Sequence, residues 1–366
     1  MELTVTQKNL SRALTDCSRV ANARAGLPVL GNVLLKTDSA GLYIAATNLE
    51  IASTVKINAK IDKPGAITVP AKLITELVSN LPNETVTLST KNNSLNIACG
   101  GYTSSINGID AEEFPELPVI DEKDSVRYAI ATDLFKRAVS QTIFACSSDT
   151  TRPVLTGVYW HSHDGYLYTA GTDGYRLAEK RITETKSDLM AIVPTTALQE
   201  VLRTLHDDIE EIEVLFDQTQ VRFRVDSSEI TSRLIEGNYP DYRQLIPKDN
   251  PTKTTVPLAE CVRMTKLASL FARDTGGSIT IATDADTSEF SIRSTASEMG
   301  ESLAKLETTV VGGGLVSLNS RYLTDVLSVI DADTISIEYG AKLAPITIRP
   351  NKDDADYLTI IMPLKS

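Results

Sequence analysis

Two stretches of the chain, LPVLGNVLLKTDSAGLYIAATNLE (residues 27–50) and RPVLTGVYWHSHDGYLYTAGTDGY (residues 152–175), read as copies of one another. Pro28 and Pro153 hold the same place in the two stretches and lie 125 positions apart. A repeat at a fixed offset indicates a duplicated structural unit, and its period gives the size of each unit. Other landmarks along the chain have the same spacing.

Two sets of helix-like segments extend the repeat to a third copy. The first set is residues 5–21, 130–146 and 256–272, and the second is residues 67–89, 191–214 and 316–339. A period near 125 gives three copies of ordinary domain size in a chain of 366 residues. The sequence therefore predicts three domains, at residues 1–124, 125–251 and 252–366.

Each copy mixes two kinds of hydrophobic pattern. Apolar residues recur at helical spacing in the second segment, as at Leu73, Leu77 and Leu81, whereas residues 86–89 alternate apolar and polar as a strand does. Short turn signals such as His163-Asp-Gly165 join consecutive strands. The pattern predicts an α+β fold with antiparallel sheets and two helices in each copy.

Composition points to a protein without a leader segment or a membrane span. The four cysteines are scattered and form no CxxC pair, which favours reduced thiols, and the N-terminus lacks a basic region followed by an apolar run. We therefore expect a cytoplasmic protein. The net charge is −12, but the six helix candidates together carry +4, which leaves −16 on the remaining residues. Helices that are basic relative to the sheets suit a polyanion partner, although solvated helix faces alone would also explain the difference.

No pattern in the chain predicts an active site. His161 and His163 lack a third metal ligand, and the glycines at 312–314 lack the Lys-Ser/Thr of a phosphate loop. We therefore expect no metal, no cofactor and no catalytic residue, and a binding role is favoured. An enzyme with its site at GTDG (171–174) is a weaker alternative.

The stretch GTDGYRLA (171–178) corresponds to ATNLEIAS (46–53) in the first copy. Its threonine and its Asp/Asn position are shared by the two copies, after which Gly174-Tyr-Arg176 replaces Leu49-Glu-Ile51. A difference confined to one copy is a candidate for function, and Tyr and Arg are enriched in protein–protein hot spots.

Taken together, these motifs resemble the bacterial DNA polymerase III beta subunit family, the sliding clamps. The resemblance runs from end to end and in register. It includes LPVLGN (27–32), TVPAK (68–72), EEFPELP (112–118), GTDGYRLA (171–178), GNYPDYRQLIPK (237–248), NSRYLTDVL (319–327) and IMPLKS (361–366).

The resemblance implies three clamp domains per chain and a head-to-tail homodimer that forms a six-domain ring, with helices inside and sheets outside. Such a ring encircles double-stranded DNA without sequence preference and holds the replicative polymerase on it, without being an enzyme itself. Implied partners are a clamp loader, the polymerase alpha subunit, other polymerases and repair or ligation proteins. A monomeric clamp-fold scaffold that does not encircle DNA is the alternative.

The resemblance also implies three groups of site residues. The partner-peptide cleft would comprise Leu155, Thr172, Gly174, Tyr175, Arg176, Leu177, Pro240, Gln244, Leu245, Asn319, Tyr322, Pro345, Ile360, Met362, Pro363 and Leu364. DNA would contact Arg24, Lys72 and Arg152, and further helix candidates are Arg12, Arg19, Lys136, Arg137, Arg203, Arg263 and Lys266. The dimer interface would include Ile106, Leu270 and Phe271.

Overall fold

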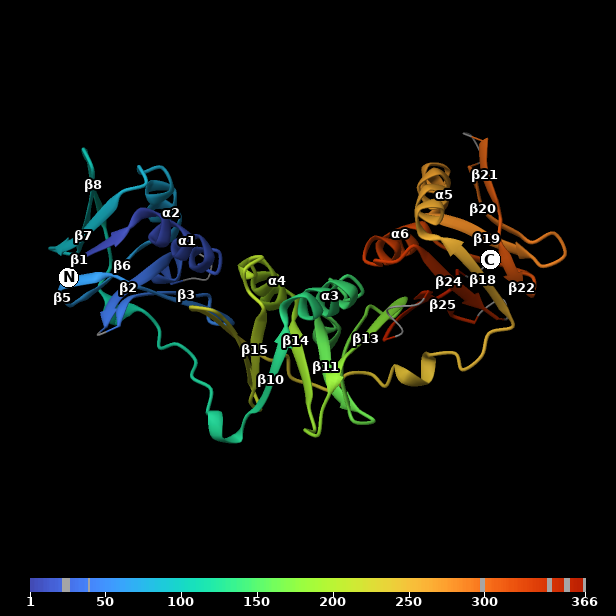
Figure 1. Cartoon of the computed structure of the whole chain (residues 1–366), viewed down its shortest axis with the longest axis horizontal. Coiled ribbons are helices and arrows are strands. Elements are labelled where there is room, and N and C mark those ends of the chain that lie inside the picture. Colours follow the sequence, from blue (N-terminus) through green and yellow to red (C-terminus); the bar gives the residue numbers. More distant parts are fainter. Residues whose placement is uncertain (22–26, 39, 297–299, 341–343, 352–355, 365–366) are drawn as a thin grey trace. The chain divides into compact units, whose positions relative to one another are not determined.

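The computed structural model describes residues 1–21, 27–38, 40–296, 300–340, 344–351 and 356–364 (Figure 1). It confirms the threefold repeat. Each copy runs strand, helix, four strands, helix, three strands, and the first and third copies each carry one further short strand. This order also confirms the α+β class expected from the mixed periodicities.

The elements of the three copies follow one another along the chain. The first copy contains β1 (Glu2–Thr6), α1 (Gln7–Ser18), β2 (Asn32–Asp38), β3 (Gly41–Thr47), β4 (Ile51–Ile57), β5 (Lys60–Lys63), β6 (Ala66–Pro70), α2 (Ala71–Ser79), β7 (Thr85–Lys91), β8 (Ser94–Cys99) and β9 (Tyr102–Asn107). The second contains β10 (Val126–Ala131), α3 (Thr132–Ile143), β11 (Gly157–His163), β12 (Tyr166–Thr172), β13 (Arg176–Glu184), β14 (Met190–Pro194), α4 (Thr195–Thr204), β15 (Glu211–Phe216), β16 (Gln220–Val225) and β17 (Ser228–Arg233). The third contains β18 (Thr252–Pro257), α5 (Leu258–Phe271), β19 (Ser278–Asp284), β20 (Glu289–Ala296), β21 (Gly300–Glu307), β22 (Thr309–Val311), β23 (Gly314–Asn319), α6 (Ser320–Ser328), β24 (Thr334–Tyr339), β25 (Ile346–Pro350) and β26 (Tyr357–Ile361).

Each repeated segment of the first set opens with the last residues of a strand. Residues 5–6 end β1 and α1 begins at Gln7, because the extended Thr6 caps the helix with its side chain. Residues 130–131 and 256–257 likewise end β10 and β18. Each first helix therefore follows directly on a strand, with no connecting loop.

Four antiparallel sheets organise these strands. Their orders are β5-β1-β7-β8-β9, then β10-β15-β16-β17-β4-β3-β2-β6, then β14-β11-β12-β13-β26-β25-β24-β18-β22, and finally β21-β20-β19-β23. The two long sheets each combine strands from two neighbouring copies, through the pairs β17–β4 and β13–β26. Hydrogen-bonded backbone therefore joins each copy to the next.

By contact density the described chain divides into two compact units. Unit 1 comprises residues 1–135 and 196–234, and unit 2 comprises residues 136–195 and 235–366. The division passes through the second copy because each long sheet holds one half of that copy. The boundaries expected at 124/125 and 251/252 follow the repeat, and they stay a prediction.

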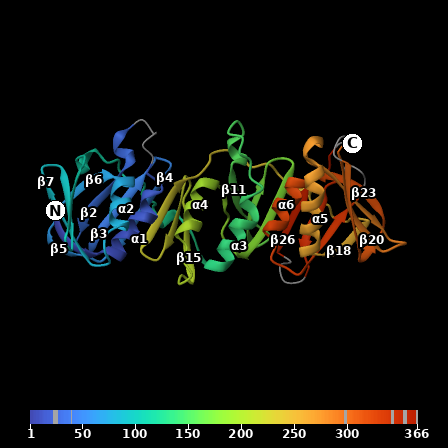
Figure 2. The same cartoon turned by 90° about the horizontal axis from the view of Figure 1, so that it is seen from above.

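The helices pack in pairs on the sheets. α1 lies beside α2 and against β3 and β4, and α5 lies beside α6 and against β20 and β21 (Figures 1 and 2). The apolar faces of these helices are buried, as at Leu10 and Leu14 on α1 and Leu323 on α6. Their polar faces remain available for other contacts.

The four cysteines are free thiols, as their scatter predicted. Burial raises the pKa of Cys17 and Cys261 to about 12, so these thiols stay protonated. No helix in the described chain has both the length and the apolar character needed to cross a bilayer.

Candidate functional site

The turn between β12 and β13 is fixed by its own side chains. Thr172 donates its hydroxyl hydrogen to the carbonyl of Arg176 at 2.6 Å and accepts a bond from the N–H of Gly174 at 3.1 Å. Asp173 accepts bonds from the N–H groups of Tyr175 and Arg176 at 2.8 and 3.0 Å. Side-chain caps of this kind hold a short turn in one conformation. The turn therefore presents Tyr175 on a rigid support, with the side chain 60% exposed.

The first copy contains the same turn. Thr47 donates to the carbonyl of Ile51 and accepts from the N–H of Leu49, and Asn48 accepts from the N–H groups of Glu50 and Ile51. This confirms that the threonine and the Asp/Asn position form the shared scaffold. The three residues that follow, 49–51 in the first copy and 174–176 in the second, differ between the copies. They can therefore have a different role in each copy.

Arg176 contacts the aromatic ring of Tyr322, on which the exposed Tyr175 stacks. Its guanidinium pairs with Asp173 at 3.2 Å and with Asp325 of α6, and it lies 4.7 Å from the ring centroid of Tyr322. The Tyr175 ring stacks on the Tyr322 ring with centroids 6.5 Å apart. The Arg176 side chain is only 11% exposed. It therefore orients the aromatic pair and presents little charge to a partner.

The C-terminal tail lies along the same turn. The N–H of Met362 donates to the carbonyl of Tyr175, and the N–H of Leu364 donates to the carbonyl of Ser317, both at 2.8 Å. The first bond continues the β13–β26 ladder beyond the last strand, and the second joins the tail to β23. We call Tyr175 of the turn, Tyr322 of α6 and Met362 of the tail the tail surface; Tyr175 and Met362 are exposed, and Tyr322 is half-buried.

A segment that joins the second and third copies covers the neighbouring face of the long sheet. Tyr242 of this linker segment (residues 237–246) packs with Leu177 of β13 and Ile360 of β26. Leu245 in the same segment is 51% exposed. The linker segment thus rests on the strands that lead into the turn and the tail.

The sixteen residues expected in the partner-peptide cleft all lie in unit 2, but they are not equally accessible. The buried members, which form supporting core, are Leu155, Thr172, Leu177 and Ile360. The exposed members are Gly174, Tyr175, Pro240, Gln244, Leu245 and Met362. The half-buried members are Arg176, Asn319, Tyr322, Pro345, Pro363 and Leu364.

The motif comparison missed two carboxylates of this surface, Asp173 and Asp325. Asp325 follows Tyr322 by one helical turn, so the helical spacing of α6 could have placed both side chains toward the same neighbour. The contact with Arg176 depends on tertiary structure, because Arg176 and Asp325 are 149 residues apart in the sequence.

Comparison with known proteins covers the whole chain. The family models of the DNA polymerase III beta subunit match in three parts, the N-terminal domain at residues 1–118, the central domain at 129–241 and the C-terminal domain at 243–365. The chain belongs to the DNA polymerase III beta subunit family.

Individual relatives agree over their full length. The beta sliding clamps of Staphylococcus aureus and Staphylococcus epidermidis are 28% and 29% identical, with complete coverage of both chains. The DNA polymerase sliding clamp of Bacillus subtilis has a TM-score of 0.94 at 27% identity, over 100% of this chain and 99% of its own. A sliding clamp from Bartonella birtlesii, solved with griselimycin bound, has a TM-score of 0.93 at 27% identity with both chains fully covered.

The ten basic residues expected to contact DNA in this beta-subunit chain differ in exposure and in ion pairing. Arg12, Lys72, Arg137 and Lys266 are exposed and form no ion pair within the described parts of the chain. The residues already paired with carboxylates are Arg19 (with Asp16 and Glu200), Arg152 (with Asp149), Arg203 (with Glu200) and Arg263 (with Glu260). Lys136 is half-buried, and Arg24 lies outside the described residues.

The expected dimer-interface residues also differ in exposure. Leu270, near the end of α5, is 50% exposed, and Phe271 beside it is half-buried. Ile106 on β9 is only 4% exposed, so its side chain belongs mainly to the core of its own copy.

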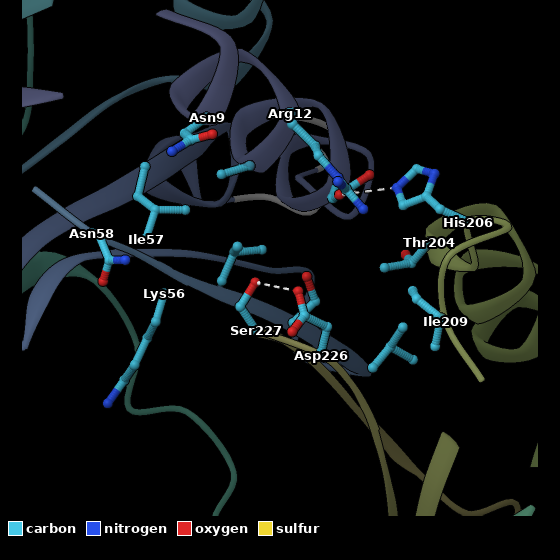
Figure 3. A pocket seen from close by; sticks show the side chains of 15 residues that line it. Asn9, Arg12, Lys56, Ile57, Asn58, Thr204, His206, Ile209, Asp226 and Ser227 are labelled. Carbon is cyan, nitrogen blue, oxygen red and sulfur yellow. Dashed lines mark hydrogen bonds and ion pairs between the residues drawn. The ribbon is translucent and has the colours of Figure 1, made fainter. Parts of the chain in front are cut away.

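One polar cavity of about 350 Å³ opens in unit 1. Figure 3 shows Arg12 of α1 and His206, which follows α4, on its walls. His206 lies 3.8 Å from Asp16, and Asp226 lines the side formed by the β16–β17 turn. Sequence patterns missed the cavity because it combines short pieces of separate elements. The described residues contain no cluster suited to a metal ion, and the His161–His163 pair forms none.

Proposed function

We propose that two copies of this chain close head to tail into a ring that encircles duplex DNA and tethers the replicative polymerase to it. The observation that supports this proposal concerns two of the edge strands in the described chain, β9 and β21. β9 ends one sheet and β21 ends another. Each is the counterpart of a strand that joins neighbouring copies elsewhere in the chain.

Strands of neighbouring copies pair in the same way at two places within the chain. β4 of the first copy pairs antiparallel with β17 of the second, and β13 of the second pairs with β26 of the third. β21 occupies the place of β4 and β13 in its sheet, and β9 occupies the place of β17 and β26. Pairing of β21 with β9 of a second copy would repeat the same junction. A heterologous contact that closes after two chains gives a ring of six domains.

The two free edges expose apolar side chains. Leu303 on β21 is 56% exposed, and Tyr102 on β9 is 64% exposed. Long exposed sheet edges are templates for pairing with another chain, so proteins usually cover them. Association of two copies would cover both kinds of edge at each junction.

Membership of the beta-subunit family supports a non-catalytic role as the processivity subunit of DNA polymerase III. The DNA contacts would come from the exposed helix residues Arg12, Lys72, Arg137 and Lys266. Phosphate contacts carry no sequence information, which suits a ring that slides. The protein would act in the cytoplasm without a cofactor, and a clamp loader would open the ring.

The tail surface, together with the exposed side chains of the linker segment, is the proposed docking site for partner peptides. Exposed aromatic and methionine side chains on a fixed backbone suit short peptide motifs. The polymerase alpha subunit would bind here, and repair or ligation proteins would compete for the same surface.

Retention on DNA tests the ring. The protein is loaded onto a singly nicked circular plasmid with its own clamp loader and ATP, and the complex is separated by gel filtration before and after linearisation. We expect co-elution with the circle and loss from the linear form, because only a topological link is lost at DNA ends. A protein that is monomeric by mass in solution and leaves circles as fast as linear DNA would contradict the ring and would instead fit a monomeric scaffold.

A further inference from the structure

The linker segment (residues 237–246) is held to the long sheet of unit 2 by buried polar contacts as well as by apolar packing. Tyr239 stacks on Tyr159 of β11 with ring centroids 4.6 Å apart. Tyr242 packs with Leu177 and Ile360, and its hydroxyl donates a hydrogen bond to the buried Glu179. The segment therefore has a defined position on the sheet.

Four side chains form a cluster that we call the Glu179 network; Glu179, His161 and Tyr242 are buried, and Arg243 is half-buried. Glu179 of β13 is 5% exposed, accepts a hydrogen bond from the Tyr242 hydroxyl and pairs with Arg243 at 2.9 Å. His161 of β11 lies 2.7 Å from the same hydroxyl oxygen through Nε2. Because the tyrosine hydrogen goes to Glu179, His161 donates its Nε2 hydrogen to the tyrosine oxygen. The Arg243 guanidinium also covers the Tyr168 ring at 4.4 Å.

Burial favours the neutral form of two members of the network, His161 and Glu179. Burial lowers the pKa of His161 to about 4, so the imidazole is neutral near pH 7. Burial raises the pKa of Glu179, while the hydrogen bond from Tyr242 and the Arg243 charge oppose the rise. A neutral histidine carries one ring hydrogen, and this is the hydrogen that Nε2 of His161 donates to the hydroxyl oxygen of Tyr242.

The equivalent segment of the first copy packs through apolar side chains, and no ion pair attaches it within the described residues. Phe114 takes the place of Tyr239, and it packs with Val29, Leu34 and Ala45, while Leu117 takes the place of Tyr242. Thr54 stands where Glu179 stands in the second copy. Apolar packing is therefore sufficient to hold such a segment on its sheet. Buried ion pairs are commonly no more stabilising than apolar residues of similar volume, so attachment alone does not account for the network.

The two segments differ in what they display. The segment of the second copy carries Pro240, Gln244 and Leu245, all exposed and all expected to contact partner peptides. Hydrogen bonds and ion pairs impose direction and register, which apolar contacts do not. The second copy, whose segment displays these residues, has the network, whereas the first copy does not. We therefore connect the network with the position of the displayed side chains.

We propose that the Glu179 network positions the linker segment so that Pro240, Gln244 and Leu245 form part of the partner-binding surface. Glu179 and Tyr242 are then positioning residues for partner affinity and do not touch the peptide. This inference rests on the proposed function of the tail surface.

The test compares affinity with stability. Binding of the immobilised DNA polymerase III alpha subunit of the same organism is measured together with the melting temperature. The first variant is Glu179→Gln, which removes the ion pair. The second is the triple variant Glu179→Thr/Tyr242→Leu/Arg243→Gln, which removes the buried charge and resembles the first copy. We expect Kd to rise about tenfold in both, while the triple variant melts no lower than the unmodified protein.

Two further variants are controls. Glu213→Gln removes ion pairs with Arg127 and Arg224 in unit 1, and it should bind the alpha subunit normally. Tyr175→Ala removes a proposed direct contact and should weaken binding. Loss of affinity that only follows a lowered melting temperature would overturn the positioning role, and so would unchanged affinity in both network variants.

Different outcomes contradict the positioning role of the Glu179 network and the proposed function of the tail surface. If the unmodified protein does not bind the alpha subunit, the proposed function fails. If it binds and Tyr175→Ala weakens binding, but the network variants bind normally, only the positioning role fails.

Discussion

At the scale of single residues, the duplicated turn separates scaffold from specialised positions. Thr47 and Thr172 make the same pair of hydrogen bonds, which shows that this part of the repeat serves folding. The following position differs, with Leu49 at φ +76° and Gly174 at φ +92°. A left-handed conformation is strained for leucine and free for glycine, so the second copy holds its turn with less strain. The second copy is also the one that exposes a tyrosine there.

His161 leads to a prediction about pH. Its pKa falls from 6.5 to about 4 on folding, because burial disfavours the charged ring. A lowered folded pKa stabilises the protein above pH 6.5, and this contribution is lost as pH falls toward 4. We expect His161→Phe to reduce the acid sensitivity of unfolding by on the order of 3 kcal/mol over this range. The raised pKa of Glu179 acts in the opposite direction and remains in both proteins.

Chemical denaturation of the two proteins at several pH values between 7 and 4 measures this difference. The unmodified protein should lose stability more steeply than the variant as pH falls. Parallel profiles would show that His161 is charged in the folded protein or has no part in the pH dependence.

At the scale of elements, the helices combine a buried apolar face with an exposed face of mixed charge. Ion pairs within or between helices neutralise some basic residues, such as Arg263 with Glu260 on α5. Others, such as Lys72 on α2 and Arg137 on α3, have no such partner in the described residues. The unpaired residues are available to phosphate without first breaking an internal ion pair. They are therefore the better candidates for DNA contact.

Neutralising Lys72 and Arg137 should weaken DNA binding and flatten its salt dependence. Each lost phosphate contact reduces the slope of log K against log salt by about 0.9, so the double variant Lys72→Gln/Arg137→Gln should lose up to about 1.8. Titration of labelled duplex DNA at several low salt concentrations gives the slope. Lys91→Gln removes an exposed charge from strand β7 and is the matched control. Equal slopes for the unmodified protein and the double variant would exclude these helix residues as phosphate contacts.

At the scale of the whole molecule, the long sheets make the repeat continuous. Each junction between copies is a pair of antiparallel strands, β4–β17 and β13–β26. In the described chain, the edge strands β9 and β21 hold the corresponding places but have no partner strand on that side. The proposed pairing of β9 with β21 of a second chain would cover both edges. Assembly would then repeat the internal junction and would need no new type of contact.

Leu303→Asp in β21 should separate the proposed dimer. A charge on this edge would be desolvated at the junction, and we expect the dimer Kd to rise at least about tenfold. Val311→Asp is the control, since Val311 on β22 is also exposed, at 60%, and belongs to another sheet. Sedimentation equilibrium at micromolar protein measures the change. A dimer equally stable in both variants would show that β21 does not form the interface.

The threefold repeat, the α+β class and the two halves of the turn could be predicted from the sequence, because periodicity and spacing are local properties of the chain. The family could also be predicted, from the resemblance of several motifs along the chain. The three-dimensional arrangement was needed to find which of the described basic residues are ion-paired and which carboxylates hold Arg176. It also decided how Glu179, His161 and Tyr242 meet beneath the linker segment. The physical reason is that pairing and burial depend on residues far apart in the chain, whose distances no local pattern records.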